Sequence, residues 1–117
     1  MVEVVKTSRD FNKVEQYLMT VSPAMKSLKD IPDGTSIEVA GYMVFKDIKD
    51  TGEASEILSF ITPDNVVYSG QSATFKRSLD DIADIMDGEQ FSIIKMSGKT
   101  KAGRDYINCM LDVASIQ

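Results

Sequence analysis

The sequence predicts a mainly β protein with helices, in which five strands form a β-barrel, and two observations lead to this fold class. Between Ser36 and Val113 the apolar residues recur with the period of strands, then of one helix, then of strands again. Turn-forming residues separate these segments. The resulting order of three strands, one helix and two strands is that of the five-stranded OB-fold. We expect a single domain over residues 1–117, with 1–33 as an N-terminal extension and 34–117 as the barrel.

The first part of the barrel is a set of three strands, which follows a turn at residues 31–34. Gly41 interrupts the first strand, which predicts a bulge or a sharp bend. Beyond Gly41 the alternation does not show whether Tyr42 and Val44 or Met43 and Phe45 face the core. The reversal at residues 63–65 makes the last two strands a hairpin. The predicted strands are Ser36–Ile48, Ser55–Pro63 and Asn65–Ser69.

A helix and a second hairpin complete the predicted barrel. Ser72 caps the helix Ala73–Asp87, whose apolar stripe faces inward and which ends at Gly88. We expect this helix, between strands three and four, to close the bottom of the barrel. In the hairpin, Cys109 alternates in phase with core residues, whereas Tyr106 points outward. The hairpin strands are Gln90–Ser97 and Asp105–Val113.

The N-terminal region shows weaker patterns. Residues 2–6 could add a short edge strand, and Ser8 or Asp10 is expected to cap a short helix that starts near Phe11. Pro23 suits the first turn of a second helical piece, Pro23–Lys29. This region either packs on its own domain or mediates self-association, and the sequence leaves both open.

Composition and charge narrow the class of protein. Hydrophobic residues make up 43% of the chain, and no apolar run approaches the roughly 18 residues that cross a bilayer. With a single cysteine the expectation is a soluble cytoplasmic protein without membrane contact. The net charge of −5 argues against a nucleic-acid binder, but its distribution is uneven. Five acids and no base lie between Asp80 and Glu89, while four bases and no acid lie between Lys95 and Arg104.

The sequence lacks the residues of common enzyme sites. It contains no histidine, which removes the most frequent general base and the usual zinc ligand. The segment Gly98-Lys99-Thr100 resembles the end of a P-loop, but the glycine required five residues earlier is Ile93. The acids of the helix are expected to be solvated. We therefore expect no enzyme activity, no metal and no cofactor.

A sheet with outward aromatic rings beside a basic loop is typical of single-stranded nucleic-acid binding. Bases stack on the rings, while a positive groove follows the phosphates. Phe60 could also belong to the core, to which Phe11, Phe75 and Phe91 are assigned. Tyr68 and Tyr106 are better candidates than the phenylalanines, because a hydroxyl favours a site in which one edge of the ring is in contact with water. The candidate residues are Tyr42, Phe45, Lys46, Phe60, Tyr68, Lys95, Lys99, Lys101, Arg104 and Tyr106.

Several short segments resemble the single-stranded DNA-binding proteins of small phages with protein-primed genomes, the phi-29-like group. They are residues 27–35, Phe45-Lys46-Asp47, Val67-Tyr68-Ser69 and the hairpin with Gly98 and Gly103. The likeness runs from about Ser27 to Val113. It implies a role in phage DNA replication in the host cytoplasm, coating and protecting displaced single-stranded DNA. It also implies that Phe45 and Tyr68 touch DNA. The N-terminal region shows no match.

Two alternatives remain beside a DNA-coating protein. The barrel could be a protein-interaction module, such as a phage assembly or inhibitor protein, that uses its acidic helix. Reversing the charges of Asp80, Asp81 and Asp84 would damage such a contact, whereas changes at Lys99 and Lys101 would not. Sugar binding by an OB-fold is the other alternative, and the absence of tryptophan weakens it. The number of nucleotides covered and the partner proteins in replication do not follow from the sequence.

Overall fold

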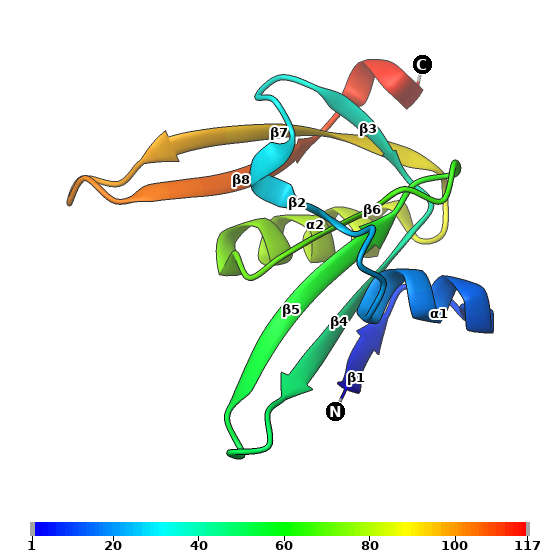
Figure 1. Ribbon diagram of the computed structural model, residues 1–117. Helices are drawn as coiled ribbons and strands as arrows, with labels where there is room; N and C mark the ends of the chain where they lie inside the picture. Colours follow the sequence, from blue (N-terminus) through cyan, green and yellow to red (C-terminus); the bar gives the residue numbers. More distant parts are fainter. Residues whose placement is uncertain (1, 117) are drawn as a thin grey trace. The chain divides into compact units, whose positions relative to one another are not determined.

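The computed structural model describes residues 2–116, and this part of the chain is mainly β with two α-helices (Figure 1). Its strands form one sheet of five and one of three, and no pairing among the described residues closes either sheet into a barrel. The mainly β class with helices is thus confirmed, whereas the closed five-stranded barrel is not. The chain divides into two compact units, residues 2–28 with 40–71 and residues 29–39 with 72–116.

The first unit contains the five-stranded sheet, in the order β1-β4-β5-β6-β2. Strands β4 and β5 form a long antiparallel hairpin at its centre, and β1 pairs antiparallel with β4, which confirms the predicted N-terminal edge strand. The short β2 runs parallel to β6. Helix α1 belongs to the same unit. The bounds are β1 Val2–Thr7, α1 Lys13–Thr20, β2 Lys26–Ser27, β4 Gly41–Ile48, β5 Ala54–Ile61 and β6 Val67–Gly70.

The second unit contains the three-stranded sheet, in the order β3-β7-β8, together with helix α2. Both pairings are antiparallel, and β7 and β8 form a long hairpin (Figure 1). Ser72 caps α2 as predicted, because its Oγ accepts a hydrogen bond of 3.1 Å from the amide of Phe75. The bounds are β3 Ser36–Val39, α2 Ala73–Met86, β7 Phe91–Lys99 and β8 Asp105–Leu111, with 3-10 turns at Leu28–Asp30 and Val113–Ile116.

The predicted strand Ser36–Ile48 is two strands, β3 and β4, which belong to different sheets. The break lies at Ala40, beside the glycine that predicted a bend. A β-carbon at Gly41 would lie 2.7 Å from the Phe11 ring, so only glycine leaves room for that ring. The prediction of an interruption is confirmed. The prediction of one continuous bent strand is wrong, because the two segments pair with different strands.

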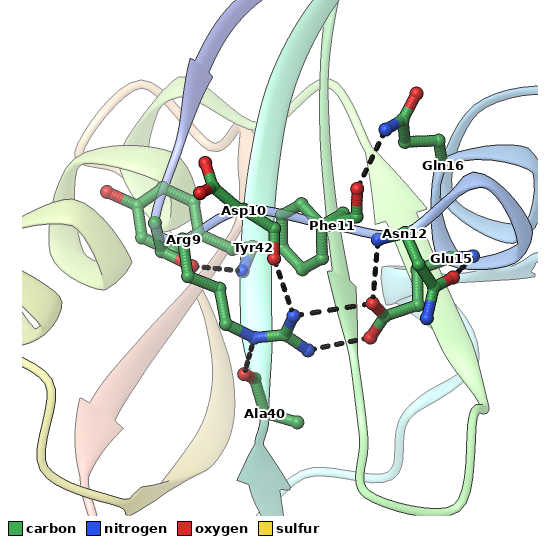
Figure 2. Close-up of polar contacts among 9 residues, drawn as sticks. Arg9, Asp10, Phe11, Asn12, Glu15, Gln16, Ala40 and Tyr42 are labelled. Carbon is green, nitrogen blue, oxygen red and sulfur yellow. Dashed lines mark hydrogen bonds and ion pairs between the residues drawn. The ribbon is translucent and has the colours of Figure 1, made fainter.

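An arginine side chain ties the N-terminal residues to the five-stranded sheet (Figure 2). The Nε of Arg9 donates to the carbonyl of Ala40 at 2.9 Å, and the Arg9 guanidinium pairs with Glu15 at 2.7 Å. The Arg9 side chain, with the amide of Asn12, holds the pKa of Glu15 below its ordinary value. The segment between β1 and α1 is therefore joined both to the helix and to the start of β4.

Asn12, and neither Ser8 nor Asp10, caps α1, so the predicted cap is wrong. Asn12 accepts from the amide of Glu15 at 2.8 Å, and Glu15 accepts from the amide of Asn12 at 3.1 Å, which is a capping box. The hydroxyl of Ser8 is used elsewhere, because it accepts from the amide of Tyr42 at 2.9 Å. Ser8 therefore does not cap the helix, because its hydroxyl is hydrogen-bonded to β4.

The predicted helical piece Pro23–Lys29 is wrong. That segment contains strand β2, and its last two residues enter a 3-10 turn. The physical reason is that Lys26 and Ser27 pair with the backbone of β6. This tertiary pairing overrides the weak helical propensity of the local sequence.

The core of the first unit lies on one face of the five-stranded sheet. Apolar side chains from β4, β5 and β6 pack there with residues that precede and form α1. The cluster consists of Phe11, Met19, Met43, Phe45, Ile61 and Val67. In the second unit, Phe75, Leu79 and Met86 form the buried side of α2, which confirms the predicted apolar stripe. Burial also confirms Phe11, Phe75 and Phe91 as core residues.

Candidate nucleic-acid interface

An aromatic row crosses three strands of the five-stranded sheet. The strand register sets Tyr42 of β4 opposite Phe60 of β5, and Phe60 opposite Tyr68 of β6. Directly opposed residues share a face of the sheet, so the three side chains form a ladder. The rings of Phe60 and Tyr68 are stacked, with centroids 5.4 Å apart and an angle of 28° between their planes.

The ladder runs from the interior towards the surface. Tyr42 is 1% exposed and Phe60 is fully buried, whereas Tyr68 is partly exposed. Phe45 lies on the opposite face, inside the core cluster. The structure therefore leaves no accessible ring surface for a base on Tyr42, Phe45 or Phe60. Sequence patterns do not separate these residues because both faces of β4 are buried between Gly41 and Phe45, so alternation carries no information there.

A second aromatic platform lies on the β7–β8 hairpin. Gly98 and Tyr106 are opposed in the register, and the Tyr106 ring packs on the glycine. A β-carbon built on Gly98 would lie 2.7 Å from the Tyr106 hydroxyl oxygen and 2.9 Å from Cζ. Tyr106 is 38% exposed, which agrees with the predicted outward direction. The glycine thus supports one side of the ring, and the ring remains accessible to solvent.

Basic side chains surround the turn at the end of this hairpin. Lys99, Lys101 and Arg104 are all exposed. One carboxylate lies among them: Asp105 Oδ1 is 3.7 Å from Lys99 Nζ, in a pair that is open to solvent. Exposed pairs of this kind contribute little to stability and are easily exchanged for another anion. Lys46, on β4 of the other unit, is partly buried.

Lys95, a predicted phosphate contact, is buried in this fold. Its side chain is only 7% exposed, and its ammonium lies 2.9 Å from Asp33 Oδ1. Asp33 also accepts a hydrogen bond from Ser97, and these two donors lower the pKa of Asp33. The hydrophobic period does not reveal this pair, because a basic residue in a strand is ordinarily exposed. For Asp33 the local sequence indicates only a turn.

Lys26 is a basic residue that sequence reasoning missed. Its local sequence predicts a helix, whereas β2 places it opposite Tyr68 at the edge of the sheet. No local signal could have found it, because a two-residue parallel strand depends on a partner more than 40 positions away in the sequence.

The described part of the chain offers few groups for metal binding or nucleophilic chemistry. Among residues 2–116, no group of three or more metal-ligating side chains comes together, and no helix is long and apolar enough to span a membrane. Cys109 is buried, as predicted, and burial raises the pKa of its thiol to about 12. A thiol in that state is a packing group and not a nucleophile.

The chain belongs to the family described as phage single-stranded DNA-binding protein, whose sequence model matches residues 3–112. It is 28% identical over 94 residues to the single-stranded DNA-binding protein of Bacillus phage PZA, which covers 75% of this chain and 76% of that protein. The single-stranded DNA-binding protein of Bacillus phage phi29 matches with the same identity and coverage. The resemblance seen in the short segments is thus confirmed, whereas the absence of a match in the N-terminal region is wrong, because the family match begins at residue 3. No solved structure matches the chain significantly.

Proposed function

We propose that this protein binds single-stranded DNA in phage replication in the host cytoplasm, coating and protecting displaced strands without sequence preference and without catalysis. Membership of the phage family and the names of its two relatives support this function. The observation that carries it is on the β7–β8 hairpin, where the accessible Tyr106 ring lies beside a turn that bears three exposed cations.

The chemistry of this hairpin suits an unpaired strand. Every base has an aromatic face, so stacking on Tyr106 is tolerant of sequence and is typically worth about 1–3 kcal/mol per base. The ammonium and guanidinium groups of Lys99, Lys101 and Arg104 attract the phosphates that link successive bases. No step in this process requires a bond to be broken, which agrees with a protein that lacks histidine.

We assign direct DNA contacts to the candidates with accessible side chains. They are Lys46, Tyr68, Lys99, Lys101, Arg104 and Tyr106. Phe60 supports the ring of Tyr68 from behind, at the stacked distance of 5.4 Å. Tyr42, Phe45 and Lys95 have a packing role in this proposal, because their side chains are buried.

The OB-fold is the finer architecture that we propose, within one domain. The order β4-β5-β6, α2, β7-β8 supports it, since it is the strand and helix order of that fold. An experimentally determined structure with a strand of oligo(dT) tests it directly.

Self-association through the N-terminal region is also a proposal. Val14 and Tyr17, one helical turn apart on α1, are both more than half exposed, and an apolar helix face of this kind suits contact with a second copy. Light scattering of the purified protein at several concentrations would reveal it as a rising mass, and a constant monomer mass would contradict it.

Intrinsic tyrosine fluorescence during titration with poly(dT) tests the function. The protein contains no tryptophan, so its four tyrosines are the main emitters. We expect quenching that saturates and that weakens with added salt, because phosphate contacts release counterions. The Tyr106→Ala variant should lose about 5- to 150-fold in affinity, the equivalent of 1–3 kcal/mol, whereas Tyr106→Phe should retain most of it.

Two results would contradict the proposal. The first is a folded wild-type protein whose fluorescence does not change with DNA at low salt. The second is binding that neither depends on salt nor responds to Tyr106→Ala and Tyr68→Ala.

A further inference from the structure

Strand β2 places a lysine next to the accessible end of the aromatic row. In the parallel pairing of β2 with β6, Lys26 is in register with Tyr68. Residues in register on neighbouring strands project from the same face of a sheet. The row Tyr42–Phe60–Tyr68 therefore continues into Lys26 at the sheet edge, away from its buried end.

The position of Lys26 is fixed although β2 has only two residues. Leu28, which directly follows β2, is fully buried and packs against Gly70 at the end of β6. A β-carbon on Gly70 would lie 2.9 Å from Leu28 Cδ1, so the glycine provides the space in which the leucine sits. This contact and the backbone pairing both hold β2 against β6.

The ammonium of Lys26 is available for a ligand. Its side chain is exposed, and within residues 2–116 it has no ion-pair partner. Two of the predicted phosphate contacts differ in this respect, since Lys95 is paired with Asp33 and Lys99 lies near Asp105. An unneutralised ammonium next to a supported aromatic ring combines the two groups that one nucleotide requires, a face for its base and a cation for its phosphate.

The dimensions agree with a single nucleotide. Neighbouring strands lie about 4.8 Å apart, and the lysine stem has four flexible carbons. The ammonium can therefore follow a phosphate on either side of a base that is stacked on Tyr68. A glutamine or an alanine at position 26 would leave the ring in place and remove this cation.

We propose that Lys26 is a phosphate-binding residue of the Tyr68 site, so that single-stranded DNA crosses from β6 to the β2 edge of the five-stranded sheet. This inference rests on the proposed DNA-binding function. It adds a contact that lies outside the segments from which the DNA-binding residues were predicted.

The test is the binding of fluorescein-labelled oligo(dT), followed by anisotropy at several salt concentrations. The Lys26→Ala variant should bind more weakly and should lower the slope of log K against log salt by about 0.7, the value for one lost phosphate contact on a single strand. Lys26→Arg should restore the slope. Lys13→Ala is the matched control, because Lys13 is an exposed lysine of the same unit on α1, and it should change neither quantity.

A double-mutant cycle then tests whether the two residues hold the same nucleotide. If they do, Lys26→Ala should cost less in a Tyr68→Ala background than in the wild type. In a Tyr106→Ala background, which alters the other unit, its cost should be unchanged. Additive losses with Tyr68→Ala would overturn the shared site.

The failure of this inference is distinguishable from failure of the proposed function. If the wild-type protein does not bind oligo(dT), the function itself is wrong. If it binds and Lys26→Ala behaves like Lys13→Ala, the function stands and the role of Lys26 is wrong. Weaker binding with an unchanged salt slope and a lower Tm would assign Lys26 a structural role and would also overturn the inference.

Discussion

Lys95 and Tyr106 lie in the same hairpin, and both are candidates for contact with DNA, yet their side chains have different surroundings. Lys95 is a basic strand residue with the sequence context of a phosphate contact, but it is buried and paired with Asp33. Tyr106 follows the basic segment, and its ring packs on Gly98 on one side while the side chain stays exposed to solvent. Neighbours that are not adjacent in the sequence therefore decide whether each side chain is buried or exposed.

The Asp33–Lys95 pair predicts a specific dependence of stability on pH. The hydrogen bond from Ser97 and the ammonium of Lys95 lower the pKa of Asp33 below its ordinary value of 3.8. A lowered pKa in the folded state means that the carboxylate stabilises the protein fully well above pH 3.8. That contribution is lost as the pH falls through 3.8 towards the lowered pKa. We therefore expect Asp33→Asn to lower the Tm at pH 7, by an amount that shrinks in this acidic range.

Thermal unfolding of both proteins between pH 7 and about pH 3 checks this expectation. Asp50→Asn is the control, since it removes the same charge from an exposed turn. A difference in Tm between wild type and Asp33→Asn that stays constant over the whole range would contradict the role of the carboxylate.

At the scale of elements, three hairpins in the described part of the chain share one turn. In each, the amide of the first residue donates to the carbonyl of the fifth at 2.8–2.9 Å, and the amide of the fourth donates to the carbonyl of the first at 2.9–3.0 Å. The fourth residue has a positive φ, of 90° at Gly52, 65° at Asn65 and 83° at Gly103. This is the three-residue hairpin loop, a type I turn followed by a left-handed residue. The turns span residues 49–53, 62–66 and 100–104.

The shared turn predicts the effect of a substitution at the end of the basic hairpin. A β-carbon on Gly103 would meet no atom within 4 Å, so only the left-handed backbone opposes Gly103→Ala. We expect a loss of about 1 kcal/mol in the free energy of unfolding. Asn65→Gly should instead change stability by less than about 0.5 kcal/mol, because asparagine already tolerates this conformation.

Urea unfolding of the two variants measures both values. Ala102→Ser, one position before the glycine, is the control and should be neutral. Equal stability of Gly103→Ala and the wild type would show that the turn does not constrain the hairpin.

At the scale of the whole molecule, the N-terminal residues complete the five-stranded sheet. Strands β1 and β2 cover the two outer strands of the β4-β5-β6 set, and Phe11 and Met19 belong to its core. Loss of one buried phenylalanine typically costs about 3–5 kcal/mol, and a typical domain has only about 5–15 kcal/mol of stability. A chain that starts at Gly34 should therefore lose cooperative unfolding and should tend to aggregate through the uncovered edges of β4 and β6.

Circular dichroism during heating of residues 34–117 tests this prediction, with the full chain as reference. A cooperative transition near the Tm of the full chain would show instead that residues 1–33 are an extension to a barrel that folds without them.

The sequence by itself determined several local elements and the family of this protein. The period of the hydrophobic residues and the turn residues were sufficient to predict the helix capped by Ser72, the two hairpins and the core position of Cys109. These features depend on neighbours within a few residues. Several short segments, in order, were sufficient for the resemblance to the phage family.

Only the tertiary structure decided which aromatic candidates reach the surface. It separated Tyr68 and Tyr106 from the buried Tyr42, Phe45 and Phe60. Where both faces of a strand are buried, the pattern of its residues does not show which neighbour each side chain meets.

The tertiary structure also decided the partners of residues that are distant in the sequence. It paired Lys95 with Asp33, brought Lys26 beside Tyr68, and divided residues 36–48 between two sheets. The physical reason is that strand register and sheet assignment join segments far apart along the chain, and no pattern within one segment specifies the strand with which it pairs.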